Sequence, residues 1–314
     1  MRIACTGSEG YIGGWLVREL RERGHQVFTQ DIHPGAGEVF DLGAEIPRRS
    51  WLSRRRPEMV IHLAALYGRV WGEIDLQKTA AANAGMTAEL ARDTAAAGAR
   101  LLFVSSSEVY GSAANVPGPV MPESPLSPLN MYGLSKKWGE EACRVYAPAG
   151  LQIARLNMPY GPAAVFPDYG SVPHFSGRAG VLGYNALHTM LWQAHHSLPI
   201  TVHRGTERCF TWVGDAVRGI AMVAESRWAG VWNVSRNDDM ITMAALAKRC
   251  TAMVPGCGSA VTETDPGGQI TMRKSLDNDR LCRLGWSPMV GLDHGMARTL
   301  DYMSHFGRNG RWNG

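Results

Sequence analysis

Metal-binding and disulfide-forming patterns are missing from this sequence of 314 residues, which has only six cysteines. The cysteines are scattered along the chain, and no two of them form a C-x-x-C pair. This distribution argues against a zinc site and against a disulfide framework, and it favours reduced thiols in a cytoplasm. We therefore expect a cytoplasmic protein that holds no metal ion.

Long apolar runs are absent as well. No segment approaches the roughly 18 uninterrupted apolar residues of a membrane span. The first six residues enter a strand pattern directly, with no signal-peptide pattern ahead of it. We expect neither a signal peptide nor a contact with a membrane.

A large excess of positive or negative charge is also absent, because 32 basic and 28 acidic residues leave a net charge of only +4. The densest basic stretch holds Arg48, Arg49 and residues 54–56, but no known nucleic-acid-binding module accompanies it. We interpret this stretch as a solvated helix face or loop and expect no nucleic acid as a partner. The weak positive bias suits an anionic small-molecule substrate.

The pattern that is present is an alternation of short apolar runs with longer helical segments, which is typical of a parallel α/β sheet. Hydrophobic residues make up 45% of the chain and charged residues 19%, as in a soluble globular protein. We predict a Rossmann-type doubly wound parallel sheet with a smaller C-terminal substrate-binding lobe. The predicted strands cover residues 3–5, 27–29, 39–40, 59–63, 101–104 and 153–156, the last of which closes the sheet, and the predicted helices include 11–23 and 79–97.

The composition changes after Pro159, and residues 162–185 are rich in glycine, proline and aromatic side chains, as in a loop-rich binding lobe. Single strands at 200–202 and 231–234 are separated by a helix that begins near Asp215, which we expect to cap it. The predicted division is a dinucleotide-binding domain of residues 1–157 with a returning segment at about 205–235. Residues 158–204 and 236–314 would then form the substrate-binding lobe.

A glycine-rich turn follows the first strand, with Gly7, Gly10 and Gly13 in the order G-x-x-G-x-x-G. Glycines in such a turn let the backbone approach a pyrophosphate, whose charge meets N–H groups at the start of the next helix. Asp31 ends the second strand, where a carboxylate bonds the adenosine ribose and repels a 2′-phosphate. The predicted cofactor is therefore NAD rather than NADP.

Two further motifs place reactive groups near such a cofactor. One is SSSEVYG at residues 105–111, and the other contains Tyr132 and Lys136, which share one face of a helix because they are four residues apart. A neighbouring ammonium lowers the pKa of a phenol. Tyr132 is therefore a candidate acid/base that takes a proton from an alcohol while hydride leaves its carbon. An ordinary amphipathic helix has the same spacing, and only the other motifs argue against that alternative.

As a set, the motifs resemble the extended short-chain dehydrogenase/reductase family, and within it the NAD-dependent nucleotide-sugar epimerases and dehydratases. The resemblance covers almost the whole chain. It rests on residues 6–13, Asp31, Asp41 and Leu42, residues 62–65, Asn83, residues 105–111, Tyr132, Lys136, residues 160–162 and 208–210, Asp215, residues 233–234, Arg273 and residues 284–288.

The resemblance implies how NAD is bound. Asp41 and Leu42 would flank the adenine, Ala64 and Ala65 would line the nicotinamide side, and Lys136 would bond the nicotinamide ribose. The complete set of cofactor-binding residues that it implies is Gly7, Gly10, Tyr11, Ile12, Gly13, Asp31, Asp41, Leu42, Leu63, Ala64, Ala65, Asn83, Tyr132 and Lys136.

The resemblance also implies a nucleotide-diphosphate sugar as substrate. Ser106 would orient the sugar 4-hydroxyl for Tyr132, with Ser107 as a further substrate contact. Arg208 and Arg273 would grip the diphosphate with their planar guanidinium groups.

The chain departs from the family pattern after Arg155. Many members read Arg-x-x-Asn-x-Tyr-Gly-Pro, with the Asn on the substrate, whereas Met158 stands at that position here. Asn157 or Asn185 would have to supply the contact instead.

Relatives in this family imply a homodimer. The helix that carries Tyr132 and its neighbour near Asn83 would pack against the same helices of a second copy. Trp138 and Met86 would supply apolar surface to that interface, unless they face the core of their own chain.

Glu108 bears on the outcome of the reaction, and with Ser106, Tyr132 and Lys136 it completes the expected catalytic set. Simple 4-epimerases of the family usually carry a neutral residue there, whereas a Ser-Glu pair occurs in mannose-type dehydratases and sugar-acid decarboxylases. A carboxylate beside a 4-keto sugar can remove the acidified C5 proton. Our first expectation is an epimerase that oxidises C4 transiently; a dehydratase or decarboxylase that uses Glu108 is close behind. A net alcohol or ketone oxidoreductase and a non-catalytic NAD-binding protein remain as alternatives.

Overall fold

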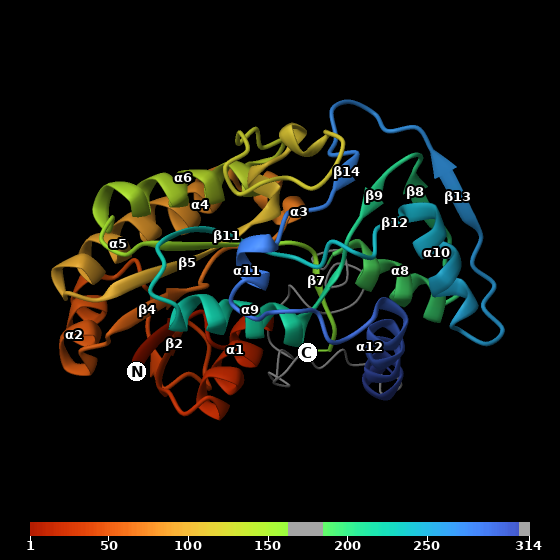
Figure 1. Ribbon diagram of the computed structural model, residues 1–314. Helices are drawn as coiled ribbons and strands as arrows, with labels where there is room; N and C mark the ends of the chain where they lie inside the picture. The colour runs from red at the N-terminus through yellow and green to blue at the C-terminus, as the bar shows by residue number, and fades with distance from the viewer. Residues whose placement is uncertain (163–184, 308–314) are drawn as a thin grey trace.

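A seven-stranded parallel sheet forms the centre of the molecule in the computed structural model, which describes residues 1–162 and 185–307 (Figure 1). The strand order β11-β6-β5-β4-β1-β2-β3 reverses direction at β1, as in a doubly wound dinucleotide-binding fold. The predicted fold class is therefore confirmed. In this spatial order the strands are β11 (Gly230–Val234), β6 (Gln152–Leu156), β5 (Arg100–Ser106), β4 (Met59–His62), β1 (Arg2–Thr6), β2 (Gln26–Asp31) and β3 (Glu38–Val39).

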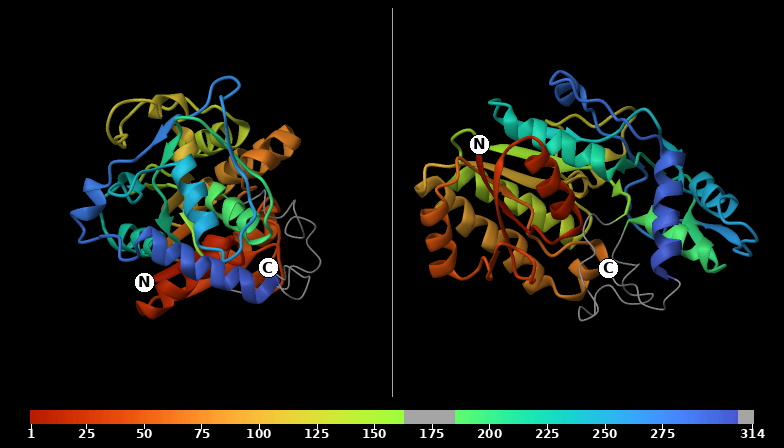
Figure 2. Two further views of the ribbon diagram at one scale, coloured as in Figure 1. Left: turned by 90° about the vertical axis from the view of Figure 1, so that its right-hand side faces the viewer. Right: turned by 90° about the horizontal axis from the view of Figure 1, so that it is seen from below.

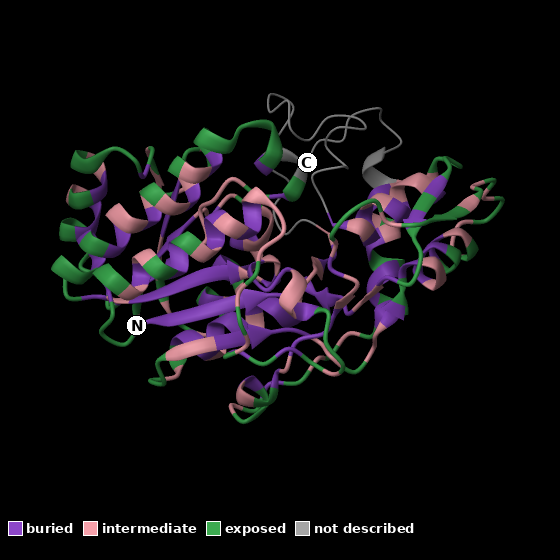
Figure 3. Ribbon diagram, turned by 90° about the horizontal axis from the view of Figure 1, so that it is seen from above, coloured by how far each residue is buried: buried purple, intermediate pink, exposed green. Residues whose placement is uncertain are grey.

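Helices cover both faces of the sheet, so its central strands are buried, as Figure 3 shows in purple, while the edge strand β3 is partly exposed. On one face α1 (Tyr11–Glu22) and α9 (Val213–Glu225) bury their apolar sides against β1, β4, β5 and β6. On the other face α2 (Glu45–Arg55), α5 (Met86–Ala96) and α6 (Met131–Tyr146) enclose a second core. Because the carboxyl ends of all seven strands lie at one edge, the residues that follow them meet there.

Two sequence expectations about this domain are wrong. The sheet does not close at β6, because β11 pairs with β6 from outside, with Val231 opposite Ile153. The single helix expected over residues 79–97 is divided into α4 (Leu76–Ala80), a π-helical turn (Ala81–Gly85) and α5. The π turn carries Asn83, whose side chain bonds outside its own helix, and such turns often lie at functional sites.

A second lobe has its own apolar core, built mainly from α8 (Ala186–His195), α10 (Met243–Ala252) and α12 (Leu292–Gly307). It lies beyond the carboxyl edge of the sheet (Figure 2). Its strands are short: β8 (Ile200–His203) with β13 (Val261–Thr264), β9 (Glu207–Arg208) between β12 (Ile241–Thr242) and β14 (Arg273–Lys274), and β7 (Pro159–Tyr160) with β10 (Thr211–Trp212). The remaining short elements are α3 (Arg69–Ile74), α11 (Asp279–Cys282) and two 3-10 turns, Ser107–Val109 and Ser112–Ala114. The segment predicted to be loop-rich, residues 162–185, lies outside the described residues except at its ends.

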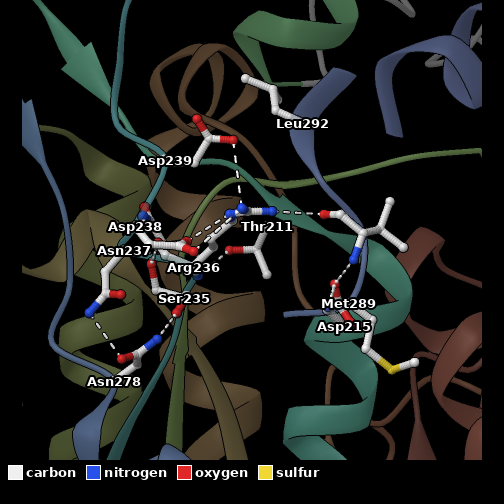
Figure 4. Close-up of polar contacts among 12 residues, drawn as sticks. Thr211, Asp215, Ser235, Arg236, Asn237, Asp238, Asp239, Asn278, Met289 and Leu292 are labelled. Carbon is white, nitrogen blue, oxygen red and sulfur yellow. Dashed lines mark hydrogen bonds and ion pairs between the residues drawn. The ribbon is translucent and has the colours of Figure 1, made fainter. Parts of the chain in front are cut away.

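Asp215 joins the two lobes rather than capping a helix. Trp212 is the N-cap of α9, and Asp215 lies in the first turn, where its carboxylate accepts from the backbone N–H groups of Met289 and Val290 at 2.9 and 3.1 Å. Arg236, two residues after the end of β11, donates to the Val290 carbonyl at 3.0 Å (Figure 4). These contacts fix the segment before α12 against the end of the sheet.

Four of the five arginines of the basic stretch pair with carboxylates, namely Arg48, Arg49, Arg54 and Arg55, and the expectation of a solvated face is wrong for Arg48. Arg48 is buried and donates to Asp93 at 2.7 Å, and Arg55 pairs with Glu38 at 2.7 Å. All six cysteines are free. Among residues 1–162 and 185–307, no helix has the length and apolar character needed to cross a bilayer.

Candidate active site

The glycine-rich turn connects β1 to α1 and is tightly enclosed. Gly7 has φ +69°, and a Cβ built there would lie 2.7 Å from the Ala64 nitrogen; one at Gly13 would lie 2.0 Å from the Gly7 carbonyl oxygen. Gly10 is the N-cap of α1, so no side chain caps the first-turn N–H groups of this 12-residue helix. Those N–H groups and the absent Cβ atoms suit the close approach of a pyrophosphate.

Two acidic side chains follow β2 and β3 at the same edge. Asp31 is buried, and its oxygens accept from the backbone N–H groups of Glu9 and His33 at 3.0 and 3.1 Å. These bonds hold the carboxylate beside the glycine turn while lone pairs remain for ribose hydroxyls. Asp41 is exposed and accepts from the Gly43 N–H at 2.8 Å, and the neighbouring Leu42 packs in the core.

Asn83 is buried and positions two other parts of the site. Its Oδ1 accepts from the Leu66 N–H at 2.7 Å, and its Nδ2 donates to the Leu66 carbonyl at 2.9 Å and to Ser135 Oγ at 3.0 Å. Ser135 in turn donates to the Tyr132 carbonyl at 2.8 Å. Asn83 therefore links the loop of Leu63, Ala64 and Ala65 to the helix that carries Tyr132.

Tyr11 and Ile12 begin α1 and face the second lobe. The Tyr11 hydroxyl donates to the Gly161 carbonyl at 3.1 Å, and Ile12 packs against both the sheet core and the core of the second lobe. This end of the helix therefore contributes to the contact between the lobes as well as to the glycine turn.

Tyr132 and Ser106 meet at the end of β5. Ser106 Oγ accepts from the Glu108 N–H at 3.2 Å, and Ser106 is close enough to Tyr132 to act on its pKa. Burial raises the pKa of Tyr132 well above its ordinary value, Tyr67 and Glu108 raise it further, and Ser106 acts in the opposite direction.

Lys136 lies one helical turn after Tyr132, as predicted, and is buried. Its ammonium sits 4.2 Å from the centre of the Phe103 ring, and burial lowers its pKa to about 8. The causes named for the shifted pKa of Tyr132 are burial, Tyr67, Ser106 and Glu108, so the effect of Lys136 on that pKa stays a prediction.

A buried ion pair links the Tyr132 helix to β6, and Ser105 links the same carboxylate to β5. Arg155 forms two bonds to Glu140 at 2.8 and 2.7 Å, and Ser105 donates to the same carboxylate at 2.7 Å. Arg155 Nη1 also donates to Tyr110 Oη at 2.8 Å. Sequence reasoning did not identify Glu140, although it continues the four-residue spacing of Tyr132 and Lys136.

Glu108 is held by groups from three segments. Lys274 on β14 forms an ion pair with Oε1, Asn130 donates to Oε2 at 2.7 Å, and Arg69 Nε lies 3.9 Å from Oε2. Burial would raise the pKa of Glu108, but Lys274, Arg69 and Asn130 lower it to about 2. Lys274 is only 2% exposed. It was missed from the sequence, where its neighbour Arg273 was selected.

The two arginines predicted to bind a diphosphate differ in position. Arg208 donates to the backbone carbonyls of Glu207 and Met272 at 2.8 and 2.9 Å and also contacts the Thr271 carbonyl, and burial lowers its pKa to about 10. Arg273 is partly exposed, with Nη1 3.7 Å from Glu207 and a buried Nε that has no partner among the described residues. On β14 it is therefore Lys274 that points inward toward the carboxyl edge.

The side chains of Asn157 and Asn185 both form hydrogen bonds within the protein. Asn157 is buried and donates to Ser235 Oγ at 3.0 Å, while its Oδ1 has no partner among the described residues. Asn185 caps α8, accepting from the N–H groups of Leu187 and His188. Met158, at the usual Asn position, has φ +43°, a left-handed conformation that is uncommon outside glycine. Ser107 is buried in the 3-10 turn after β5.

Comparison with known proteins supports the identity of this arrangement. The sequence model of the NAD dependent epimerase/dehydratase family matches residues 3–235. The chain belongs to this family. Its fold and its cofactor, NAD, follow from that membership, as the sequence predicted.

Relatives of this family member carry out different reactions. It is 27% identical to UDP-glucuronic acid decarboxylase 4 of Arabidopsis thaliana, over 94% of this chain and 67% of that protein, so it spans about two thirds of the relative's length. The fold matches MoeE5 in complex with UDP-glucuronic acid and NAD, with a TM-score of 0.80, 22% identity and coverage of 97% and 99%. It also matches the UDP-glucose 4-epimerase of Thermus thermophilus in complex with NAD, with a TM-score of 0.79, 23% identity and the same coverage.

The described residues fit NAD. The uncapped start of α1 and the enclosed turn at Gly7 suit its pyrophosphate, and Asp31 suits its adenosine ribose. When bound, NAD accepts and returns hydride. The protein's contribution at the other end is Ser106 beside Tyr132, with Lys136 one helical turn further along α6.

Proposed function

We propose that the protein is an NAD-dependent nucleotide-sugar 4-epimerase that oxidises its substrate transiently at C4. Tyr132 takes the proton of the 4-hydroxyl while hydride leaves C4, and it returns that proton when hydride is delivered to the opposite face. Ser106 holds the 4-hydroxyl in line with the phenol. The substrate is a nucleotide-diphosphate sugar, and Arg208 and Arg273 are proposed to contact its diphosphate.

The observation that carries the proposal is that Ser106, the last residue of β5, lies beside the buried Tyr132 and Lys136 of α6, at the edge where the glycine turn also lies. An NAD-binding sensor needs the glycine turn and Asp31 but has no use for a serine beside a buried tyrosine with a lysine one turn on. Related proteins that act on or bind UDP sugars support a nucleotide sugar as the substrate class.

Glu108 supports inversion at C4 over dehydration. Removal of the C5 proton requires a carboxylate that accepts a proton near neutral pH. Lys274, Arg69 and Asn130 hold the pKa of Glu108 at about 2 against the effect of burial, which makes it a weak base. Inversion at C4 needs only the proton on the 4-hydroxyl and the hydride, so it requires no base at C5. Decarboxylation remains the alternative, because loss of CO₂ from a 4-keto sugar acid also needs no base.

The test is the Tyr132→Phe variant, with Tyr146→Phe near the end of the same helix as the control. Loss of a general acid/base costs about 10²- to 10⁴-fold in turnover. We expect Tyr132→Phe to lose at least about a hundredfold while NAD binding, measured by equilibrium titration, stays the same. Turnover is followed with UDP-glucose and UDP-glucuronic acid. Near-normal turnover in Tyr132→Phe would contradict the mechanism.

A further inference from the structure

Arg48 is a buried arginine on α2, and no step of the proposed reaction uses it. Only 1% of its side chain is exposed, and its Nε donates to Asp93 on α5 at 2.7 Å. Its Nη2 donates to Glu89, one turn earlier on α5, at 3.1 Å. A well-packed apolar pair often replaces a buried ion pair without loss of stability. Folding stability therefore gives a weak reason for a charged pair at this place, and the remaining contact of the guanidinium suggests a different one.

That contact reaches the segment that follows β3. Arg48 Nη1 donates to the Leu42 carbonyl at 2.5 Å. The guanidinium thus ties the Leu42 backbone to α2, which carries Arg48, and to α5, which carries Asp93. A planar guanidinium has five N–H donors in a fixed fork, so it can bond a carboxylate and a carbonyl at the same time.

Asp41 lies between this anchor and a second one. On the other side of Asp41, Gln30 of β2 is 1% exposed, and its amide donates to the Phe40 carbonyl at 2.5 Å. Buried side chains therefore hold both the carbonyl before Asp41 and the carbonyl after it. The Asp41 side chain is itself exposed, and its carboxylate accepts from the Gly43 N–H at 2.8 Å. The position of this carboxylate is thus set from both directions along the chain.

The anchored segment lies where the adenine end of a dinucleotide would reach. In a doubly wound sheet the cofactor lies outside the carboxyl ends of the strands. Asp31, which suits the adenosine ribose, ends β2, and Val39 of β3 pairs directly with it. The segment after β3 is therefore beside the ribose that carries the base. The exocyclic amino group of adenine is a donor, and a carboxylate such as that of Asp41 is its complement.

We propose that Arg48 is a positioning residue for NAD, which holds Asp41 and Leu42 in the arrangement that receives adenine before the cofactor binds. A segment that is ordered in advance loses less conformational freedom when the ligand arrives, and the difference appears as affinity. The guanidinium acts through the Leu42 carbonyl, while Asp41 makes the contact with the base. This inference concerns cofactor binding, so it does not depend on the reaction at C4.

The test replaces the ion pair by an apolar one, in the variant that combines Arg48→Leu with Asp93→Leu. Both buried charges are removed together, so we expect urea unfolding of the cofactor-free protein to show little or no loss of stability. The affinity for NAD, measured by calorimetry, should fall about three- to tenfold, which corresponds to ordering a short segment on binding. The matched control is Arg49→Leu on the same helix, whose side chain pairs with Asp93 and Glu45. The control should keep the NAD affinity.

A second ligand separates positioning from general loosening of the domain. Nicotinamide hypoxanthine dinucleotide has a carbonyl in place of the adenine amino group, so it cannot donate to Asp41. We expect the unmodified protein to bind it at least about tenfold more weakly than NAD. Because this ligand gains nothing from a preformed Asp41, the apolar pair should change its affinity by less than about twofold. The preference for NAD should therefore shrink in the variant and persist in Arg49→Leu.

Arg48→Lys provides a test that does not depend on the apolar pair folding. It keeps a charge for Asp93 but has no planar fork that also reaches Leu42, so we expect the same reduced preference for NAD. Equal weakening of both dinucleotides would show that Arg48 supports the domain as a whole and would overturn the inference. Unchanged NAD affinity in the variants would overturn it as well. Either result leaves the 4-epimerase proposal intact, because that proposal is tested by turnover of the sugar.

Discussion

Glu108 shows how one neighbour changes the chemistry of a residue. In the sequence it stands beside Ser107, and a carboxylate at that place is chemically able to remove a proton. In the structure, Lys274 and Asn130 occupy its oxygens, and its pKa falls to about 2 although burial acts in the opposite direction. Glu108 is thus the residue type that removes a proton in other enzymes, but here it stays ionised and is a weak proton acceptor.

The Glu108→Gln variant tests this interpretation. Because C4 inversion needs no base at C5, we expect turnover to change by less than about tenfold, which is below the cost of losing a general base. Product formed in deuterated water should carry no label at C5. If the variant instead stops turnover and accumulates reduced cofactor on the enzyme, Glu108 removes the C5 proton and the protein is a dehydratase.

At the scale of elements, a polar chain connects β1, β4 and the helix after the π turn. His62, the last residue of β4, contacts Thr6 Oγ1 at 2.8 Å through Nδ1 and Thr87 Oγ1 at 3.0 Å through Nε2. Thr87 donates to the Asn83 carbonyl at 2.7 Å. Burial, with a smaller effect of Lys136, lowers the pKa of His62 to about 3. The imidazole is therefore neutral in the folded protein over the whole physiological range.

This neutral histidine makes folding stability dependent on pH. Below pH 6.5 the unfolded chain binds a proton at His62, whereas the folded protein does not until about pH 3, so stability falls as pH falls through that interval. The contribution is about 2 kcal/mol at pH 5. The His62→Gln variant has no imidazole to protonate at this position, and its amide can still bond both threonines. We therefore expect the variant to lack the part of the decrease in folding stability between pH 7 and pH 5 that His62 causes. Urea unfolding at the two pH values measures it, and an unchanged decrease in the variant would refute the assignment.

At the scale of the whole molecule, the Tyr132 helix presents an apolar face outward. Trp138 is 43% exposed and Val145 is 69% exposed, and their spacing of seven residues places them on one side of α6. Leu76 on the neighbouring α4 is 51% exposed, and α4 lies beside α6 in Figure 1. Met86, the other residue predicted for an interface, is half-buried and packs against the core of its own chain.

We predict that this face forms the homodimer expected from the sequence. Sedimentation at micromolar concentration should show a dimer. Trp138→Glu should dissociate it, because an unpaired carboxylate would be buried in the interface. Trp228→Glu, at another exposed tryptophan, should leave the dimer intact. A monomeric unmodified protein would contradict the prediction.

The sequence by itself determined the parallel sheet, the glycine turn and the spacing of Tyr132 and Lys136. These features depend on local periodicity and on backbone conformations that only certain residues adopt, so they can be read along the chain. The break at Asn83 was not predicted, although Asn83 and Gly85 have low helical propensity, because a π turn is defined by its hydrogen bonding and Asn83 bonds Leu66 on another loop.

Only the tertiary structure decided which charges meet. β14 has only two residues, so its sequence has no periodicity that would show which of them faces inward. The packing of the two lobes places Lys274 rather than Arg273 beside Glu108. The same long-range packing moved Asp215 from an expected helix cap to the contact with Met289 and Val290. Charge pairing between distant segments depends on the arrangement of the lobes, and that arrangement has no signature in the local sequence.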